Sequence, residues 1–258
     1  MCSLDRRGDV FILTITGDDE HRLNPTRIDS IRAALRRAKL ETRPAALITT
    51  AQGKFFSNGY DLDWAFSHQD PTRRLDRARL MSRKLRLLVE ELISLPMPTI
   101  AAVTGHASAA GFILALCHDY LLMRKERGFL YMSEVDIKFK ISAWFTAIVK
   151  NKIASPRVWR DVILKAEKIT ADRGVEMGIV DSSHATAGGT LEAAVALGME
   201  LVRRQWSGEV YAGCRRVMFE GVLATLRTDE TVEDSGQIVD DDDDDDKAVI
   251  GNMQVSKL

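Results

Sequence analysis

The stretch TIAAVTGHASAAGFILALC, residues 99–117, decides the fold. Thr99–Thr104 has the apolar and β-branched character of a buried strand. Gly105–Gly111 brings small residues, and Gly111–Cys117 is apolar throughout, which predicts a buried helix. Small residues let a ligand approach the main chain, and amides at the start of a helix point outward with partial positive charge. Alone, such a segment could also be an ordinary tight turn.

A second segment of this kind, KFFSNGYDL at residues 54–62, follows a strand predicted at Ala45–Thr50. Before it, Val10–Ile15 also has a strand pattern, and Pro25-Thr26 opens a helix with apolar residues spaced by three and four. Arg73–Leu95 predicts a long amphipathic helix, which Pro96-Met97-Pro98 ends. This order indicates an α/β fold.

Further along, two short strands are predicted at Tyr120–Met123 and Phe129–Met132. Beyond Ala143 the pattern is mostly helical, with helices predicted at Trp159–Leu164 and Leu191–Val202. Thr190 is the predicted N-cap of the last of these helices.

Composition excludes several classes of function. Lys and Arg number 36 against 37 Asp and Glu, so the net charge of -1 gives no general attraction for nucleic acid or an anionic membrane. Cys2, Cys117 and Cys214 form no CxxC pair, which disfavours a disulfide framework and a zinc site. The first residues, MCSLDRRGDV, are charged too early to supply the apolar core of a secretory signal, so we expect none, and we expect no membrane span because no stretch is long enough.

The C-terminal tail changes character after Thr228. It becomes acidic and polar, with seven aspartates at Asp240–Asp246, which predicts disorder because like charges repel and nothing apolar is available to bury. Calcium binding is disfavoured, because the run lacks the glycine and spacing of a calcium loop. The last residues, Ser256-Lys257-Leu258, form a tripeptide that peroxisomal import receptors read.

Together these motifs resemble the crotonase superfamily of acyl-CoA enzymes. The similarity is carried by Phe-x-x-Gly-x-Asp-Leu near residue 60, by Ile-Ala-Ala-Val-x-Gly-x-Ala-x-x-Ala-Gly at residues 100–111, by Asp119, and by the Ile169–Asp172 and Met177–Asp181 segments. It implies a crotonase-type spiral of repeated β-β-α units with a C-terminal helical region used for trimerisation. We therefore expect a spiral core at 1–200, a helical region at 201–228 and an acidic tail at 229–258.

The resemblance also implies a thioester-binding site. The two backbone amides of the oxyanion hole fall on Asn58 and Ala110, and Asn58, Gly59, Tyr60, Asp61, Leu62, Ala110 and Gly111 are the implied substrate-binding residues. An enolate forms when a proton leaves the carbon beside a thioester, and one preorganised donor to its oxygen is worth about 3 to 4 kcal/mol.

One carboxylate of the family's hydratases is missing. Ile113 occupies its helix position, and an aliphatic group cannot activate water, which disfavours hydration. The other falls on Glu134, and Ser142-Ala143-Trp144-Phe145 is similar to the aromatic segment of the family's enoyl-CoA isomerases. The implied function is Δ3,Δ2-enoyl-CoA isomerisation in β-oxidation, with a Glu134 pKa raised by apolar neighbours.

Several alternatives remain open. An enoyl-CoA hydratase or a non-catalytic acyl-CoA-binding protein is possible, and Asp136 is a rival base if the strand continues. His106 and His118 are expected to be structural. Lys138 and Lys140 stand where the family has a glycine-containing turn, facing either solvent or CoA phosphates, and a lysine there disfavours a positive φ.

The expected partners and location follow from the same resemblance. We expect an acyl-CoA substrate with no separate cofactor and no metal, a homotrimer or hexamer, and recognition by the peroxisomal import receptor. The N-terminal segment and Ser256-Lys257-Leu258 are most similar to the plant peroxisomal branch of the isomerases.

Overall fold

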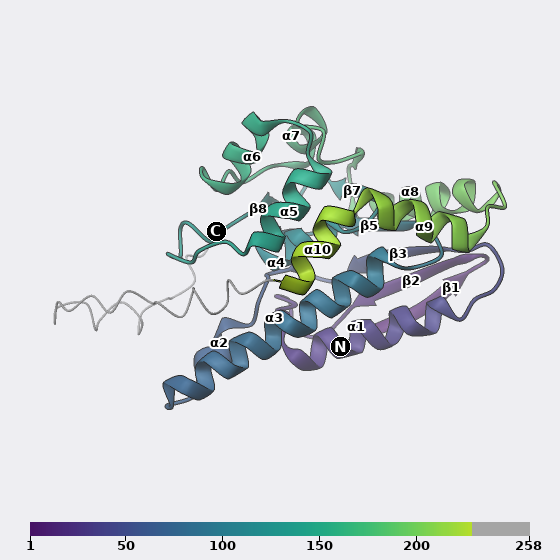
Figure 1. Ribbon diagram of the computed structural model, residues 1–258. Helices are drawn as coiled ribbons and strands as arrows, with labels where there is room; N and C mark the ends of the chain where they lie inside the picture. Colours follow the sequence, from purple (N-terminus) through teal and green to yellow (C-terminus); the bar gives the residue numbers. More distant parts are fainter. Residues whose placement is uncertain (229–258) are drawn as a thin grey trace.

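The computed structural model describes residues 1–228, which form two sheets surrounded by helices (Figure 1). The Asp240–Asp246 run and the terminal tripeptide lie outside the described residues. The strands are Cys2–Arg7 (β1), Val10–Ile15 (β2), Ala46–Ala51 (β3), Phe55–Ser57 (β4), Thr99–Val103 (β5), His106–Ser108 (β6), Tyr120–Arg124 (β7), Leu130–Tyr131 (β8) and Ser182–His184 (β9).

The helices follow the strands in a repeating order. They are Pro25–Lys39 (α1), Leu62–Phe66 (α2), Pro71–Ile93 (α3), Ala110–Leu116 (α4), Ala143–Lys152 (α5), Pro156–Ile163 (α6), Ala171–Glu176 (α7), Ala187–Val202 (α8), Gly208–Met218 (α9) and Glu220–Thr228 (α10). Strands β3, β5 and β7 each enter the large sheet, and the strand after each enters the small sheet before the next helix. The predicted α/β spiral of β-β-α units is confirmed.

The large sheet has the strand order β1-β2-β3-β5-β7-β9, and the small sheet the order β4-β6-β8. All neighbouring strands are parallel except β1 and β2, which form an antiparallel hairpin around Gly8 at a φ of 58°. β1 was not predicted, because its polar and charged residues leave only partial burial.

The two faces of the large sheet contribute to different apolar clusters, because side chains alternate along a strand. Leu13, Leu47 and Val103 point into the main core, which α1 and α3 cover. Their neighbours Ile12, Ile48 and Ala102 point the other way and pack under α8. Parallel strands buried on both faces read as continuous apolar runs, as these do.

Helix boundaries agree with the sequence patterns within about two residues at α1, α3 and α4, whereas α6 and α8 each begin earlier than predicted, at Pro156 and Ala187. Asn24 caps α1 by accepting from the Arg27 amide at 2.9 Å, and Pro25 follows at the first helical position. The predicted cap of α8, Thr190, is wrong. Thr186 caps the helix, accepting from the Gly189 amide at 3.0 Å, whereas Thr190 is buried one turn later. Gly188-Gly189 in the first turn obscures this start.

The C-terminal helices α9 and α10 pack on their own chain. Phe219, Val222 and Leu226 join the main core, and α10 lies against α5 and α3 (Figure 1). The division at residue 200 and the trimer remain predictions. In residues 1–228 no helix is long and apolar enough to cross a membrane.

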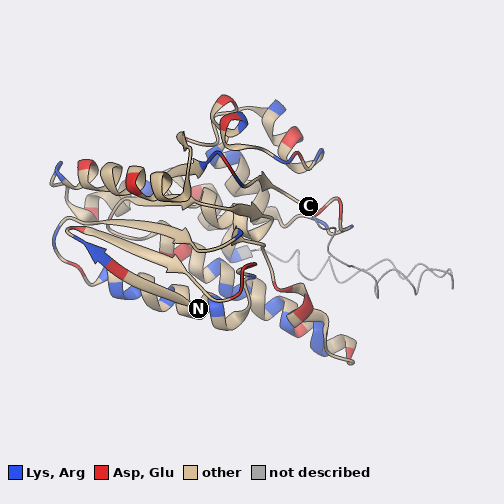
Figure 2. Ribbon diagram, turned by 180° about the vertical axis from the view of Figure 1, so that it is seen from behind, with Lys and Arg blue, Asp and Glu red and all other residues tan. Residues whose placement is uncertain are grey.

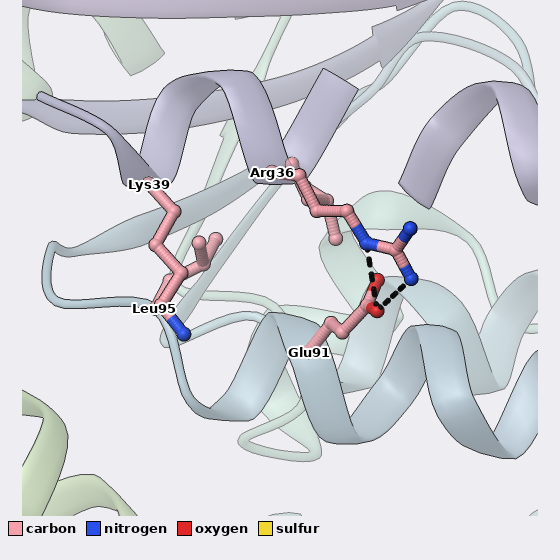
Figure 3. A pocket seen from close by; sticks show the side chains of 5 residues that line it. Arg36, Lys39, Glu91 and Leu95 are labelled. Carbon is pink, nitrogen blue, oxygen red and sulfur yellow. Dashed lines mark hydrogen bonds and ion pairs between the residues drawn. The ribbon is translucent and has the colours of Figure 1, made fainter. Parts of the chain in front are cut away.

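A shallow pocket lies between α1 and α3 and is lined by Leu35, Arg36, Lys39, Glu91 and Leu95 (Figure 3). Glu91 Oε1 accepts from Arg36 Nη2 at 2.7 Å. None of the predicted substrate-binding or catalytic residues lines this pocket.

Candidate active site

The three strands of the small sheet bring the predicted segments to one edge. β4 leads into Asn58, β6 into Ala109-Ala110, and β8 toward Glu134. β4 and β8 both pair in parallel with the central β6, with Ser57 beside Ala107 and Tyr131 beside Ser108. Carboxyl ends of parallel strands meet at one edge, which is where ligands bind in open α/β sheets.

The two glycine segments interlock through their backbones. Gly59 has a φ of 74°, and a Cβ on it would lie 3.0 Å from the Ser108 carbonyl oxygen and 3.4 Å from the Ala110 nitrogen. A Cβ on Gly111 would lie 2.8 Å from the Ser57 carbonyl carbon and would overlap its oxygen. Glycine is therefore required at both positions for the loops to approach this closely.

The backbone amide of Asn58 is not available to a ligand at this edge of the small sheet. That amide donates to the Glu20 carbonyl at 2.8 Å, and the neighbouring Gly59 amide reaches the Ser57 hydroxyl at 3.3 Å. The prediction that the Asn58 amide holds a substrate oxygen is therefore contradicted, because its N–H is already used within the protein. The segment as a whole still lies beside α4.

Ala110 is the first residue of α4, and its amide cannot bond within the helix. Within residues 1–228 no acceptor is found for this amide. Ala109 directs the chain into the helix with a φ of 47° and a ψ of -123°. Such a conformation is uncommon for a non-glycine residue. The donor role of Ala110 stays a prediction that this geometry permits.

Asp61 has a clear structural part in the segment. Its Oδ1 accepts from the Trp64 amide at 3.0 Å, which caps α2, and its Oδ2 accepts from Asn24 Nδ2 at 3.1 Å. The Tyr60 ring lies 6.1 Å from that of Phe145. Contact of Tyr60, Asp61 and Leu62 with CoA stays a prediction.

Glu134 lies in the turn after β8 and is only 9% exposed. Among the described residues its Oε2 has no hydrogen-bond partner. Burial raises the pKa of Glu134 to about 7, partly offset by the backbone amides of Glu134 and Ser133. The predicted upward shift is confirmed. Asp136 is exposed in the same turn, so the strand does not continue and Asp136 does not share the buried position.

The neighbouring helices supply apolar and aromatic surface. Ile113 on α4 and Trp144 on α5 are fully buried, and Phe145 is nearly so. The Trp144 and Phe145 rings meet edge to face at 4.3 Å, and α4 packs against α5. No carboxylate occurs in α4, whose sequence is AGFILAL.

The turn after Glu134 adopts the conformation that its sequence disfavours. Lys138 has a φ of 57°, and the Phe139 amide closes the turn by donating to the Glu134 carbonyl at 2.8 Å. The expectation that lysine would avoid a positive φ is wrong here. The chain must reverse direction at Lys138 for the Phe139 amide to reach the Glu134 carbonyl. The Lys138 and Lys140 side chains are exposed.

His118 is structural, as predicted. It is buried, its Nδ1 lies 3.0 Å from the Leu114 carbonyl, and its Nε2 lies 2.8 Å from the Thr49 hydroxyl. Burial lowers the pKa of His118 to about 4. His106 packs between the rings of Phe55 and Phe129, at 5.0 and 5.5 Å, and burial lowers its pKa as well.

Sequence patterns missed a side-chain hydrogen bond that joins two of the strand ends. Ser108 Oγ donates to Asn58 Oδ1 at 3.0 Å, which links the end of β6 to the residue after β4. His21 was also missed; it is buried, its Nδ1 lies 2.8 Å from the Phe55 carbonyl, and its own carbonyl accepts from Ser57 Oγ. No local motif marks these contacts, because each joins residues far apart in sequence. Residues 1–228 contain no group of three or more potential metal ligands.

Comparison with known proteins shows which class this architecture defines. The profile described as "Enoyl-CoA hydratase/isomerase" matches residues 10–208. A probable enoyl-CoA hydratase from Mycobacterium tuberculosis has the same fold, with a TM-score of 0.79 at 22% identity over 88% of this chain and 92% of the other. A Pseudomonas syringae enoyl-CoA hydratase/isomerase family protein also has a TM-score of 0.79, at 22% identity over 92% and 97%. The fold is that of crotonase proteins.

Closer relatives come from Arabidopsis thaliana. "Enoyl-CoA delta isomerase 1, peroxisomal" is 55% identical over 86% of this chain and 91% of its own. "Enoyl-CoA delta isomerase 2, peroxisomal" is 47% identical over 90% and 98%. The chain belongs to the enoyl-CoA hydratase/isomerase family.

Proposed function

We propose that the protein is a Δ3,Δ2-enoyl-CoA isomerase, which converts 3-enoyl-CoA to trans-2-enoyl-CoA. The observation that carries this proposal is the buried carboxyl of Glu134, whose pKa is about 7, together with the absence of any carboxylate on α4. A proton shift needs one group that gives and takes a proton, whereas hydration also needs water to be activated. The delta isomerase names of the Arabidopsis relatives support the same reaction.

Glu134 performs both proton transfers in the proposed reaction. Its carboxylate removes a proton from C2, and the electron pair moves onto the thioester oxygen to give a dienolate. The carboxylic acid then returns the proton to C4 as the C2–C3 double bond forms and the thioester carbonyl is restored. A pKa near 7 makes Glu134 a stronger base than an ordinary carboxylate, while about half of it is still ionised at neutral pH.

The Ala110 amide is the proposed donor to the dienolate oxygen, because it opens α4 beside the Gly59 turn. We assign the second donor to the Tyr60 amide, in place of that of Asn58. Tyr60 directly follows Gly59, whose Cβ position lies 3.4 Å from the Ala110 nitrogen. Replacing the Tyr60 amide by an ester should lower kcat about 100-fold, typical of losing one such donor. An equal loss from the same replacement at Asn58 would contradict the assignment.

The reaction is tested by assaying 3-enoyl-CoA conversion with wild type and Glu134→Gln. The variant should lose at least about 100-fold in kcat, since the only proposed base is removed. Asp136→Asn is the matched control, because Asp136 is an exposed acid in the same turn and should be dispensable. Turnover that survives Glu134→Gln would remove Glu134 from the mechanism.

Two other functions predict different results in the same experiment. An enoyl-CoA hydratase would add water to 2-enoyl-CoA at a rate comparable with isomerisation. A non-catalytic binding protein would retain CoA thioester without turnover in wild type or variant. The buried Ile113 disfavours the hydratase, since it provides no group to orient water.

We further propose that the enzyme acts in peroxisomal β-oxidation of unsaturated acyl chains, as a homotrimer or hexamer. The peroxisomal names of two relatives and the terminal Ser256-Lys257-Leu258 support the location. Deleting the tripeptide from a fluorescent fusion should leave the protein cytosolic, and unchanged import would refute this signal. Light scattering of the purified protein tests the oligomer.

A further inference from the structure

A stripe of arginines runs along one flank of α3. Arg79, Arg83 and Arg86 have the four- and three-residue spacing that aligns side chains on a helix. Arg83 is exposed, and Arg79 and Arg86 are half-buried. Between Pro71 and Arg86 the helix carries six arginines and one lysine against the single Asp76, and Figure 2 shows the basic segments recurring along it.

The flank of this arginine stripe is next to the place where the described chain ends. Arg86 Nη1 donates to the Leu226 carbonyl at 3.0 Å, near the end of α10. On the other flank, Lys84 pairs with Asp29 at 2.6 Å. Within residues 1–228 no carboxylate lies within 4 Å of the Arg83 guanidinium. The arginine stripe is thus a basic surface beside the origin of the tail.

The sequence that continues from Thr228 carries the complementary charge. Asp240–Asp246 offers seven adjacent carboxylates, and Asp240 is the twelfth residue after Thr228. Twelve residues reach up to about 40 Å, whereas Arg79 to Arg86 spans about 10 Å of helix, so chain length does not prevent contact. A short tether gives a linked segment an effective concentration on the order of millimolar, so weak ion pairs suffice.

We propose that Asp240–Asp246 binds the Arg79, Arg83 and Arg86 stripe of its own chain. Guanidinium groups bind carboxylates through paired donors, which suits a run of adjacent aspartates. Docking would leave residues 247–255 between the bound aspartates and Ser256-Lys257-Leu258. This inference does not depend on the proposed reaction.

Zero-length carbodiimide cross-linking of the full chain tests the proposal. In Arg83→Lys, the amine should couple to Asp240–Asp246, and mass spectrometry of the digest identifies the joined peptides. Lys84 is the internal control, because its pairing with Asp29 predicts coupling there. An equal mixture of 14N and 15N protein should give same-isotope products for a tail on its own chain. Raising NaCl from 0.05 to about 1 M, where the Debye length falls to about 3 Å, should reduce the tail product at least about fivefold.

Three outcomes overturn the proposal. They are absence of the position-83 product while Lys84 still couples to Asp29, mixed-isotope products that place the tail on another subunit, and a yield that salt leaves unchanged. Arg73→Lys is the matched variant at an exposed position outside the stripe. It should give at least about fivefold less tail product than Arg83→Lys; an equal yield would mean contact without preference for the stripe.

Discussion

The protonation state of Glu134 makes the proposed reaction depend on pH. Because the base must be ionised, and burial raises its pKa to about 7, kcat/KM should rise about tenfold per pH unit below 7 and level off above it. A pH–rate profile measures this midpoint. Asp136→Asn should leave the midpoint unchanged, and a wild-type midpoint near 4.5 would show that Glu134 is not desolvated during catalysis.

The same shift has a consequence for stability. Because the pKa of Glu134 in the folded protein lies above the ordinary value of 4.5, folding favours the protonated carboxyl. The stabilisation from this group is fully present below pH about 4.5 and is lost as the pH rises through 7. Glu134→Gln should therefore raise the free energy of unfolding by roughly 2 to 3 kcal/mol at pH 8 relative to wild type. Near pH 4.5 the difference should nearly vanish, and urea unfolding at both pH values measures it.

Ser108 donates the side-chain hydrogen bond that joins β6 to Asn58. Ser108→Ala removes this hydroxyl, and we expect a loss of roughly 1 to 3 kcal/mol in unfolding free energy, because a partly buried acceptor is left unsatisfied. A double-mutant cycle with Asn58→Ala separates this contact from packing. Additive losses would mean that Ser108 and Asn58 are not coupled.

At the scale of single elements, the turn 134–138 is strained at Lys138. A left-handed conformation, as at Lys138, destabilises a non-glycine residue by roughly 1 to 2 kcal/mol. Glycine avoids this strain, but part of the gain is lost because glycine has more conformational entropy in the unfolded chain. Lys138→Gly should thus raise the free energy of unfolding by roughly 0.5 to 1 kcal/mol in urea melts. Lys140→Gly is the control, since Lys140 has no positive φ and should show no gain. Equal effects at both positions would contradict the strain.

The contact between β4 and α4 requires glycine at position 111. Gly111→Ala places a methyl group against the Ser57 carbonyl, which is backbone and cannot move away without separating the two loops. We expect the free energy of unfolding to fall by roughly 3 kcal/mol or more, the upper end of the range for overpacking, and isomerase activity to be abolished. Gly213→Ala in α9 is the control; nothing lies within 4 Å of its Cβ position, and it should gain up to about 1 kcal/mol. A stable, active Gly111→Ala protein would contradict the interlock.

Elements were predictable where the buried positions form either a periodic stripe or a continuous apolar run. The helix α3 has such a stripe, and the strands at Val10–Ile15 and Thr99–Val103 are apolar or β-branched along their length. The charged β1, the glycine-rich start of α8 and the positive φ of Lys138 could not, since tertiary contacts decide them. Sequence motifs were enough to select Glu134 and Ala110 as site residues. They could not show that the Asn58 amide donates its hydrogen bond to the Glu20 carbonyl.

At the scale of the whole molecule, one buried ion pair joins the C-terminal helices to the sheet. Arg215 on α9 is 2% exposed; its Nε donates to Asp119 Oδ1 at 2.7 Å, and its Nη1 donates to the Leu95 carbonyl at 3.0 Å. Asp119 also accepts from the Thr99 amide at 2.8 Å. The pair of Arg215 and Asp119 therefore connects α9 to the start of β5 and to the segment that follows α3.

Removing one partner of this pair leaves a buried charge and several carbonyls without a donor. Arg215→Ala should lower the free energy of unfolding by roughly 3 to 5 kcal/mol, measured by urea denaturation. Arg216→Ala, at the exposed neighbouring position, should change it by no more than about 0.5 kcal/mol. Similar losses in both variants would mean that Arg215 contributes only as a surface residue of α9. A large loss for Arg215 alone would make docking of the C-terminal helices part of the folding of the core, since this pair, together with the Tyr211 hydroxyl that donates to Asp119 Oδ2 at 3.1 Å, joins α9 to Asp119.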